Sequence, residues 1–148
     1  MSETAIRRLL AVDFGDARTG LAATDWTGSI AVPLPRIDSR NDGEVIAAVA
    51  ALVRERDTQV VVLGMPLTRD GTPGQRAQRT AAFHERLRLA LAVPVVTVDE
   101  SHTTDEAHER LREGGLKAKR RKDLADSVAA LIILERYRQT LRRVAPPA

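Results

Sequence analysis

The spacing of apolar residues changes after the third predicted strand of this chain, and this change constrains the fold more than any other feature. The first part contains short apolar runs joined by turn residues, which predict strands at residues 9–13, 20–24 and 30–37. The second part alternates helix-spaced apolar residues with continuous apolar runs at residues 59–64 and 94–98, a pattern typical of strands buried on both faces. The sequence therefore predicts an α/β fold, with a mixed five-stranded sheet of three antiparallel and two parallel strands flanked by helices.

Four helices are predicted around this sheet from apolar residues at helical spacing. They include residues 45–53, 75–91, 103–112 and 123–142. Asp42 is a candidate N-cap of the first helix, and Asp123 is a candidate N-cap of the last. Pro33 and Pro35 restrict the third strand to an edge of the sheet, because proline cannot donate a hydrogen bond to a neighbouring strand.

The composition fits one domain of 148 residues, with a core expected over residues 8–141 and short flexible termini. The absence of cysteine excludes disulfides, thiolate metal sites and a cysteine nucleophile. No apolar run approaches the roughly 18 residues that would span a bilayer, so we expect a cytoplasmic protein without a membrane partner. Trp26 lies in a predicted turn, where it could stack on a base or be a partly exposed structural residue.

Three carboxylates fall where such a sheet binds ligands, outside the carboxyl ends of the parallel strands. Asp13 ends the first strand, Glu100 follows the last strand, and Asp126 lies early in the last helix beside apolar positions. Each acid alone also fits a structural role, as a turn former or a helix-terminal residue. Carboxylates that are brought together repel each other unless a cation binds between them, and oxygen ligands favour Mg²⁺ or Mn²⁺. The three acids together are a candidate site for metal-assisted phosphodiester chemistry.

Several motifs then resemble those of one known family. They are Val12-Asp13-Phe14-Gly15 with Arg18 and Gly20, Val62-Leu63-Gly64-Met65-Pro66-Leu67, Asp70-Gly71-Thr72, Arg76-Ala77-Gln78-Arg79, Val98-Asp99-Glu100-Ser101-His102-Thr103-Thr104, and the run from Lys122 to Ala130. In this order they resemble the YqgF family, the RuvX-type proteins described as Holliday junction resolvases or pre-16S rRNA nucleases. The resemblance extends over residues 9–137. It implies an RNase H-like fold and a metal-dependent nuclease site.

The resemblance assigns the catalytic and metal-binding roles to Asp13, Glu100 and Asp126, with Mg²⁺ or Mn²⁺ as the cofactor. One departure is Ser101, which stands where the family usually has an arginine. That arginine's phosphate contact, or its support of the acid, would have to come from elsewhere in this chain. The candidates for this role are Arg18, Arg76 and Arg79.

Residues 110–122 form a basic segment in which Gly114 and Gly115 predict flexibility. We interpret the segment as a mobile arm that contacts the nucleic-acid backbone near Asp126, and a solvated loop is the alternative. Such contacts give affinity that depends on salt and not on sequence. The predicted nucleic-acid contacts are Arg18, Arg76, Arg79, Lys117, Lys119, Arg120, Arg121 and Lys122.

We therefore predict a hydrolase, a metal-dependent endonuclease for structured nucleic acid that processes the 5′ end of pre-16S rRNA in ribosome biogenesis. One alternative is a Holliday junction resolvase that cuts four-way DNA junctions as a homodimer. A second alternative is a non-catalytic ribosome-assembly factor that binds nucleic acid without cleaving it. Metal-dependent cleavage separates the first two hypotheses from the third, and substrate preference separates the first from the second.

Overall fold

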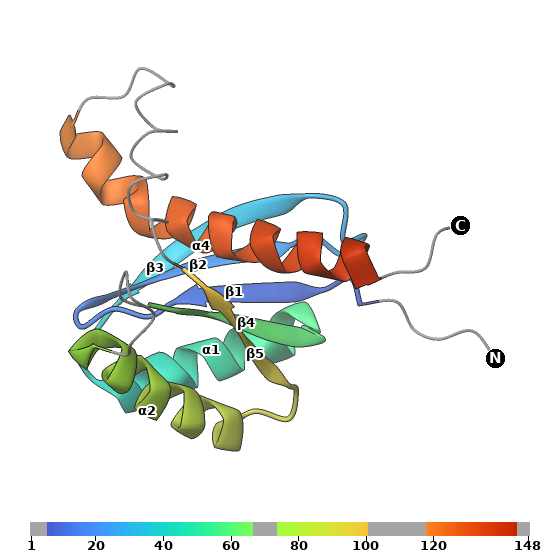
Figure 1. The fold of residues 1–148 in the computed structure, drawn as a ribbon. Helices are drawn as coiled ribbons and strands as arrows, with labels where there is room; N and C mark the ends of the chain where they lie inside the picture. Colours follow the sequence, from blue (N-terminus) through green and yellow to red (C-terminus); the bar gives the residue numbers. More distant parts are fainter. Residues whose placement is uncertain (1–5, 67–73, 101–117, 145–148) are drawn as a thin grey trace.

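The computed structural model describes residues 6–66, 74–100 and 118–144, and for residues 118–126 and 143–144 it describes the helical backbone alone. The predicted helix at residues 103–112 lies outside these ranges. No helix among the described residues combines the length and the hydropathy needed to cross a bilayer. The described elements, in chain order, are β1 (Leu9–Asp13), β2 (Arg18–Thr24), β3 (Ala31–Asp38), α1 (Asp42–Arg56), β4 (Val60–Met65), α2 (Gln75–Ala90), β5 (Val95–Asp99) and α4 (Ala118–Val144) (Figure 1).

The five strands form one mixed sheet in the order β3-β2-β1-β4-β5. β1, β2 and β3 pair antiparallel, whereas β4 and β5 run parallel to β1. This arrangement confirms the predicted combination of three antiparallel and two parallel strands. β3, which contains Pro33 and Pro35, is an edge strand as expected. β5 is the other edge strand and exposes Thr97, so the prediction that residues 94–98 are buried on both faces was wrong.

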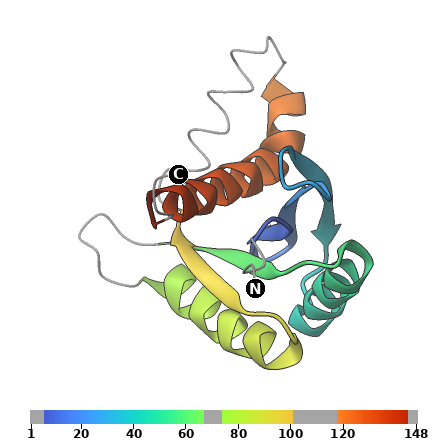
Figure 2. The same ribbon diagram turned by 90° about the vertical axis from the view of Figure 1, so that its right-hand side faces the viewer.

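Helices cover both faces of the sheet, with α4 on one face and with α1 and α2 on the other (Figures 1 and 2). Alternate residues of each strand divide between two cores. Leu10 and Val12 of β1 join the core under α1 and α2, whereas Leu9 and Ala11 join the core under α4. Asp13 has the same parity as Ala11, so β1 ends with a carboxylate on the α4 side of the sheet.

The N-cap of α1 is Asn41, so the prediction of Asp42 was wrong by one residue. The side chain of Asn41 accepts a hydrogen bond from the backbone N–H of Glu44 at 3.0 Å. Asp42 is the first helical residue, where its charge interacts favourably with the positive end of the helix dipole. The sequence offers both side chains as caps, and only the backbone conformation of the turn selects between them.

Replacement of Asn41 by Ala should lower the free energy of unfolding by about 1 kcal/mol, because one backbone N–H of α1 then loses its acceptor. Urea unfolding of the purified variant measures this loss. Asn41→Asp is the matched control and should keep most of the stability, because aspartate caps equally well. An Asn41→Ala variant as stable as the parent would show that the cap contributes nothing here.

α4 begins at Ala118, so Asp123 lies inside the helix and the prediction that it caps the helix was wrong. Residues 118–122 contain Ala, Lys and Arg and no Gly or Pro, and these residue types favour a helix. The helix therefore extends in the N-terminal direction through the basic residues. The charge pattern of these residues suggested a loop, but charge alone does not prevent helix formation.

Candidate active site

Two buried carboxylates lie at one end of the sheet. Asp13 is the last residue of β1 and is 7% exposed, and Glu100 follows β5 directly and is 5% exposed. Both stand at carboxyl ends of parallel strands, with β4 between them. The backbone N–H of Glu100 donates to the carbonyl of Met65 at 3.2 Å and ties Glu100 to the end of β4. The structure thus brings together two of the three predicted acids.

A glycine on the central strand makes room for Glu100. A Cβ atom at Gly64 would lie 2.8 Å from Oε2 of Glu100 and 2.5 Å from Cδ1 of Ile133 in α4. Any larger residue would therefore displace either the acid or the helix. This role of Gly64 was not predicted from the sequence. A glycine near the end of an otherwise apolar strand is the signal that could have revealed a close approach.

Arg76, in the first turn of α2, supplies the positive charge beside the two acids. Its Nη2 atom lies 3.5 Å from Oε1 of Glu100 and 3.8 Å from Oδ1 of Asp13. These distances are longer than a close charge-assisted hydrogen bond, and the Arg76 side chain is 59% exposed. Arg76 therefore offsets part of the negative charge without enclosing either carboxylate. Of the three arginines considered as replacements for the one missing at Ser101, Arg76 is the one that faces the acids.

The electrostatics of Glu100 leave room for a further cation. Its Oε1 atom is buried and accepts no hydrogen bond from any residue that the structure describes. A buried carboxylate oxygen without a donor is costly, and a bound cation removes that cost. Both side chains at the site offer only oxygen, the donor atom that Mg²⁺ and Mn²⁺ prefer. The residues present therefore fit a hard divalent cation.

Arg79, one turn further along α2, is held by other parts of the protein. Its Nε donates to Asp16 at 2.6 Å, and its Nη2 donates to Asp42 at 3.2 Å. The hydrogen bond to Asp16 and the charge of Asp42 raise the pKa of Arg79 above its ordinary value, although desolvation opposes them. Its guanidinium lies 5.2 Å from the ring centroid of Phe14, which stacks on Phe83 at 3.9 Å. Arg79 thus fastens α2 to the end of β1 and thereby positions Arg76.

A pocket of about 230 Å³ adjoins the acids. It is lined by Phe14, Gly15, Asp16, Arg76, Arg79 and Thr80. Gly15 forms the turn after β1, where a Cβ atom would collide with the carbonyl oxygen of Arg18. Arg18 is exposed at the start of β2, opposite Asp38 of β3. The three predicted arginine contacts therefore surround the end of the sheet that carries Asp13.

Asp126, the third predicted acid, lies in α4, and its side chain is outside the part of the chain that the structure describes. The next residue, Ser127, donates a hydrogen bond from Oγ to the carbonyl of Leu34 in β3 at 3.2 Å. One turn later, Ala130 packs on the sheet face to which Asp13 belongs. Among the described residues, no three metal-ligating groups come together. Asp126 as the third ligand therefore stays a prediction.

The predicted mobile arm differs in part from the structure. Residues 119–122 are the first helical turns of α4 and not a loop. Lys119, Arg120, Arg121 and Lys122 therefore belong to the helix that carries Asp126, although their side chains are not described. Lys117, the two glycines of the segment and Ser101 lie outside the described residues. The predicted phosphate contacts of this segment stay predictions.

Comparison with known sequences identifies relatives along nearly the whole chain. The family model described as "RuvX: Holliday junction resolvase" matches residues 7–140. A protein of Syntrophus aciditrophicus (strain SB) is 36% identical over 130 residues, which are 88% of this chain and 87% of the relative. A protein of Anaeromyxobacter sp. (strain Fw109-5) is 40% identical over 128 residues, which are 86% of this chain and 93% of the relative. Both relatives carry the name "Putative pre-16S rRNA nuclease".

Comparison with solved structures confirms the predicted RNase H-like fold. The RuvC protein of Thermus thermophilus, solved with a Holliday junction substrate, matches with a TM-score of 0.58 and 16% identity, covering 90% of this chain and 95% of that chain. The fowlpox virus resolvase, solved with Holliday junction DNA, matches with a TM-score of 0.53 and 14% identity, covering 90% and 98%. At such low identity the likeness establishes the fold alone.

Proposed function

This chain belongs to the RuvX family and is a nuclease, and from that premise we propose that it is a divalent-metal-dependent endonuclease that processes the 5′ end of pre-16S rRNA. The observation that carries the metal-dependent part is the pair of buried carboxylates, Asp13 and Glu100, at the carboxyl ends of β1 and β5. The names of relatives that are 36% and 40% identical support the RNA substrate. A cytoplasmic location is part of the same proposal.

The residues that would hold Mg²⁺ or Mn²⁺ are Asp13, Glu100 and, from α4, Asp126. Bound there, the metal would supply Lewis acidity toward the phosphodiester and would help to orient and activate the attacking water. The chain's own residues bind and orient the strand. Arg76 lies beside both described acids and can contact the phosphate, because more than half of its side chain is exposed. Arg79 holds Arg76 in place through its bonds to Asp16 and Asp42.

The wider nucleic-acid contact would come from basic residues around this end of the sheet. They are Arg18, Arg76 and Arg79, together with Lys117, Lys119, Arg120, Arg121 and Lys122. Phosphate contacts of this kind set the position of a strand and carry little information about its sequence. Specificity for a structured RNA end would then depend on shape and on contacts elsewhere on the protein.

A second candidate function is the resolution of four-way DNA junctions. The observation that favours it is the description of the matching family model as a Holliday junction resolvase. This function needs a homodimer, because two strands of a junction must be cut symmetrically. Dimerisation in the presence of a junction, measured by analytical ultracentrifugation, distinguishes it from RNA processing by a monomer.

The experiment that tests the proposal compares a labelled precursor rRNA 5′ end with a four-way DNA junction, each with Mg²⁺, with Mn²⁺ and with a chelator. We expect the wild type to cut the RNA with either metal and not with the chelator. Glu100→Gln should cut at least about 100-fold more slowly, because it loses one charged ligand. Glu85→Gln is the matched control, since Glu85 is exposed on α2 and pairs only with Arg88 among the described residues. It should cut at the wild-type rate.

A second readout measures metal binding without activity. Mn²⁺ should raise the melting temperature of the wild type and of Glu85→Gln, and it should raise that of Glu100→Gln much less. Preferred cutting of the junction would replace the RNA proposal by the resolvase. Binding of both substrates without cutting under any metal condition would replace both by the assembly-factor hypothesis.

A further inference from the structure

A second surface lies at the opposite end of the sheet from the acids. The turn between β2 and β3, residues 25–30, stands beside the start of β1, and about 13 Å of strand separates Leu9 from Asp13. Trp26 in this turn is 65% exposed and Ile30 is 59% exposed. An exposed indole offers a large apolar ring with a polar N–H, a combination that is enriched at binding interfaces. A group bound at Trp26 would therefore be distinct from the phosphate that is cleaved.

The turn that presents Trp26 is held rigidly. The carboxylate of Asp25 accepts hydrogen bonds from the hydroxyl of Thr27 and from the backbone N–H groups of Ser29 and Ile30. These bonds lower the pKa of Asp25 below its ordinary value, although desolvation raises it. Gly28 has a φ of 75°, and a Cβ atom there would meet Arg7 at 2.7 Å. The indole is therefore displayed on a fixed platform and loses little freedom when it binds a partner.

Three arginines lie near the turn that presents Trp26. The guanidinium of Arg8 lies 5.8 Å from the ring centroid of Trp26 and is held by Asp57, whose carbonyl accepts a hydrogen bond from Nε at 2.8 Å and whose carboxylate pairs with Nη2 at 3.4 Å. Arg138 of α4 donates to the carbonyl of Gly28 at 3.0 Å. Arg56, at the end of α1, lines one pocket with Trp26 and donates a 3.4 Å hydrogen bond to the carbonyl of Thr24. Among the described residues, Arg56 has no ion-pair partner, so its charge is available.

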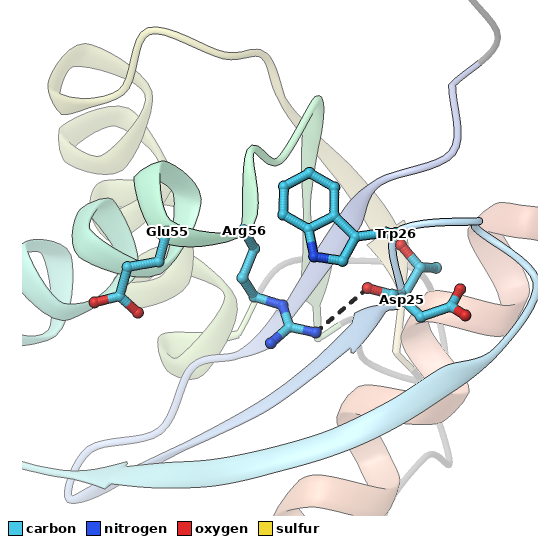
Figure 3. A pocket seen from close by; sticks show the side chains of 5 residues that line it. Asp25, Trp26, Glu55 and Arg56 are labelled. Carbon is cyan, nitrogen blue, oxygen red and sulfur yellow. Dashed lines mark hydrogen bonds between the residues drawn. The ribbon is translucent and has the colours of Figure 1, made fainter.

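The pocket between Trp26 and Arg56 has a volume of about 190 Å³. Its lining residues are Thr24, Asp25, Trp26, Glu55 and Arg56. Figure 3 shows the indole nitrogen of Trp26 turned toward Arg56, and the carboxylate of Glu55 directed away from it. The hydrogen bonds within the turn engage the carboxylate of Asp25. The pocket thus offers an aromatic ring with its N–H and the guanidinium of Arg56 to a bound group.

We infer that this pocket is a second nucleic-acid contact, in which an unpaired base stacks on Trp26 and a flanking phosphate binds Arg56. An exposed aromatic ring beside guanidinium groups is the arrangement that recognises single-stranded nucleic acid. A protein partner would need a broader apolar surface than the single ring that lines this pocket. The inference deepens the proposed function, because it names an unpaired segment as part of the substrate.

The test uses the fluorescence of Trp26, which is the only tryptophan of the chain. Wild-type protein in chelator is titrated with a labelled duplex carrying an unpaired tail, prepared once in RNA and once in DNA, and with the same duplex without a tail. We expect the tailed substrate to quench the fluorescence of Trp26. The substrate concentration at half-maximal quenching should equal the one at half-maximal change in the anisotropy of the label. The blunt duplex should quench little at the same degree of binding.

Variants separate stacking from charge. Trp26→Ala should weaken binding of the tailed substrate about five- to one-hundred-fold, and Trp26→Phe should restore most of the loss. Arg56→Gln should weaken binding of the same substrate and reduce its salt dependence. Leu89→Ala is the matched control, because Leu89 is 72% exposed on α2, and it should bind as the wild type does.

The outcomes distinguish this inference from the proposed function. Metal-dependent cleavage without quenching, and with unchanged affinity of Trp26→Ala, would overturn the second contact and leave the nuclease intact. Quenching by tailed substrate with no cleavage under any metal condition would support the second contact and remove the nuclease proposal. Equal quenching by tailed and blunt duplexes would overturn the assignment to an unpaired base. Preference between the RNA and DNA tails identifies the source of the base.

Discussion

Asp13→Asn is expected to reduce metal-dependent cleavage about 1000-fold, which corresponds to about 4 kcal/mol of transition-state stabilisation. The side chain is buried at the end of β1, and asparagine has nearly the same shape. The change therefore removes charge at the metal site without creating a cavity. Single-turnover cleavage of the preferred substrate at saturating Mg²⁺ measures the effect.

The same variant should keep or increase its stability when metal is absent. The carboxylates of Asp13 and Glu100 repel each other, and Arg76 neutralises only part of their negative charge. Asparagine at position 13 removes one of the two charges. We expect the melting temperature in chelator to be equal to or above that of the wild type, and the stabilisation by Mn²⁺ to be largely lost. Thermal unfolding with and without metal measures both effects.

Asp38→Asn is the matched control, because Asp38 is exposed at the end of β3 and pairs with Arg36. It should retain cleavage and its response to Mn²⁺. If Asp13→Asn cleaves at the wild-type rate, the assignment of the catalytic acids is wrong. If it loses cleavage only because it unfolds, the melting curve in chelator will show a lower transition and the role of Asp13 will be structural.

Gly64→Ala is expected to lower the free energy of unfolding by about 1–3 kcal/mol and to reduce cleavage strongly. The added methyl group would lie 2.5 Å from Cδ1 of Ile133 and 2.8 Å from Oε2 of Glu100, so both neighbours must move. The contact with Ile133 disturbs the packing of α4, and the contact with Glu100 disturbs the acid. Urea unfolding and single-turnover cleavage measure the two consequences separately.

A double variant separates the two contacts. Ile133→Val removes the Cδ1 atom, at a cost of about 0.5–1.5 kcal/mol by itself. Combined with Gly64→Ala, it should recover part of the stability but not the cleavage, because the contact with Glu100 remains. Gly43→Ala in α1 is the matched control for cleavage, which should stay close to the wild-type value. Its Cβ would lie 3.1 Å from Oδ1 of Asn41, so any change in stability would arise at the N-cap of α1 and not at the acids. Full cleavage by Gly64→Ala would contradict the role of Gly64 in positioning Glu100.

The sequence alone determined the element types and the sheet class. Continuous apolar runs mark β1 and β4, because strands buried on both faces leave almost no position for a polar side chain. The run at residues 94–98 also marked a strand, but the sequence did not show that β5 lies at an edge with Thr97 exposed. Pro33 and Pro35 restricted β3 to an edge, since proline lacks the donor that a central strand needs. Strand formation and the edge position of β3 follow from the residue types within each segment, so they can be predicted without knowledge of the tertiary structure.

Element ends were less accessible from the sequence. Asn41 and Asp42 are both good capping residues, and only the turn after β3 decides which one has the capping conformation. The basic residues before Asp123 can form either a helix or a solvated loop, and their charges do not distinguish the two. The structure extends α4 to Ala118 because these residue types tolerate a helix whose later turns pack on the sheet.

The candidate site was likewise predicted only in part from the sequence. The sequence placed Asp13 and Glu100 at strand ends, but their meeting depends on the order β1-β4-β5 and on the missing side chain of Gly64. Only the tertiary structure showed that Arg76 faces these acids while Arg79 is held by Asp16, although both lie on one helix three residues apart. The spacing of apolar residues is a property of one continuous segment, so the sequence is enough to predict whether that segment forms a helix or a strand. Which charges face each other depends on sheet order, register and helix docking, and these bring together residues that are far apart in the sequence.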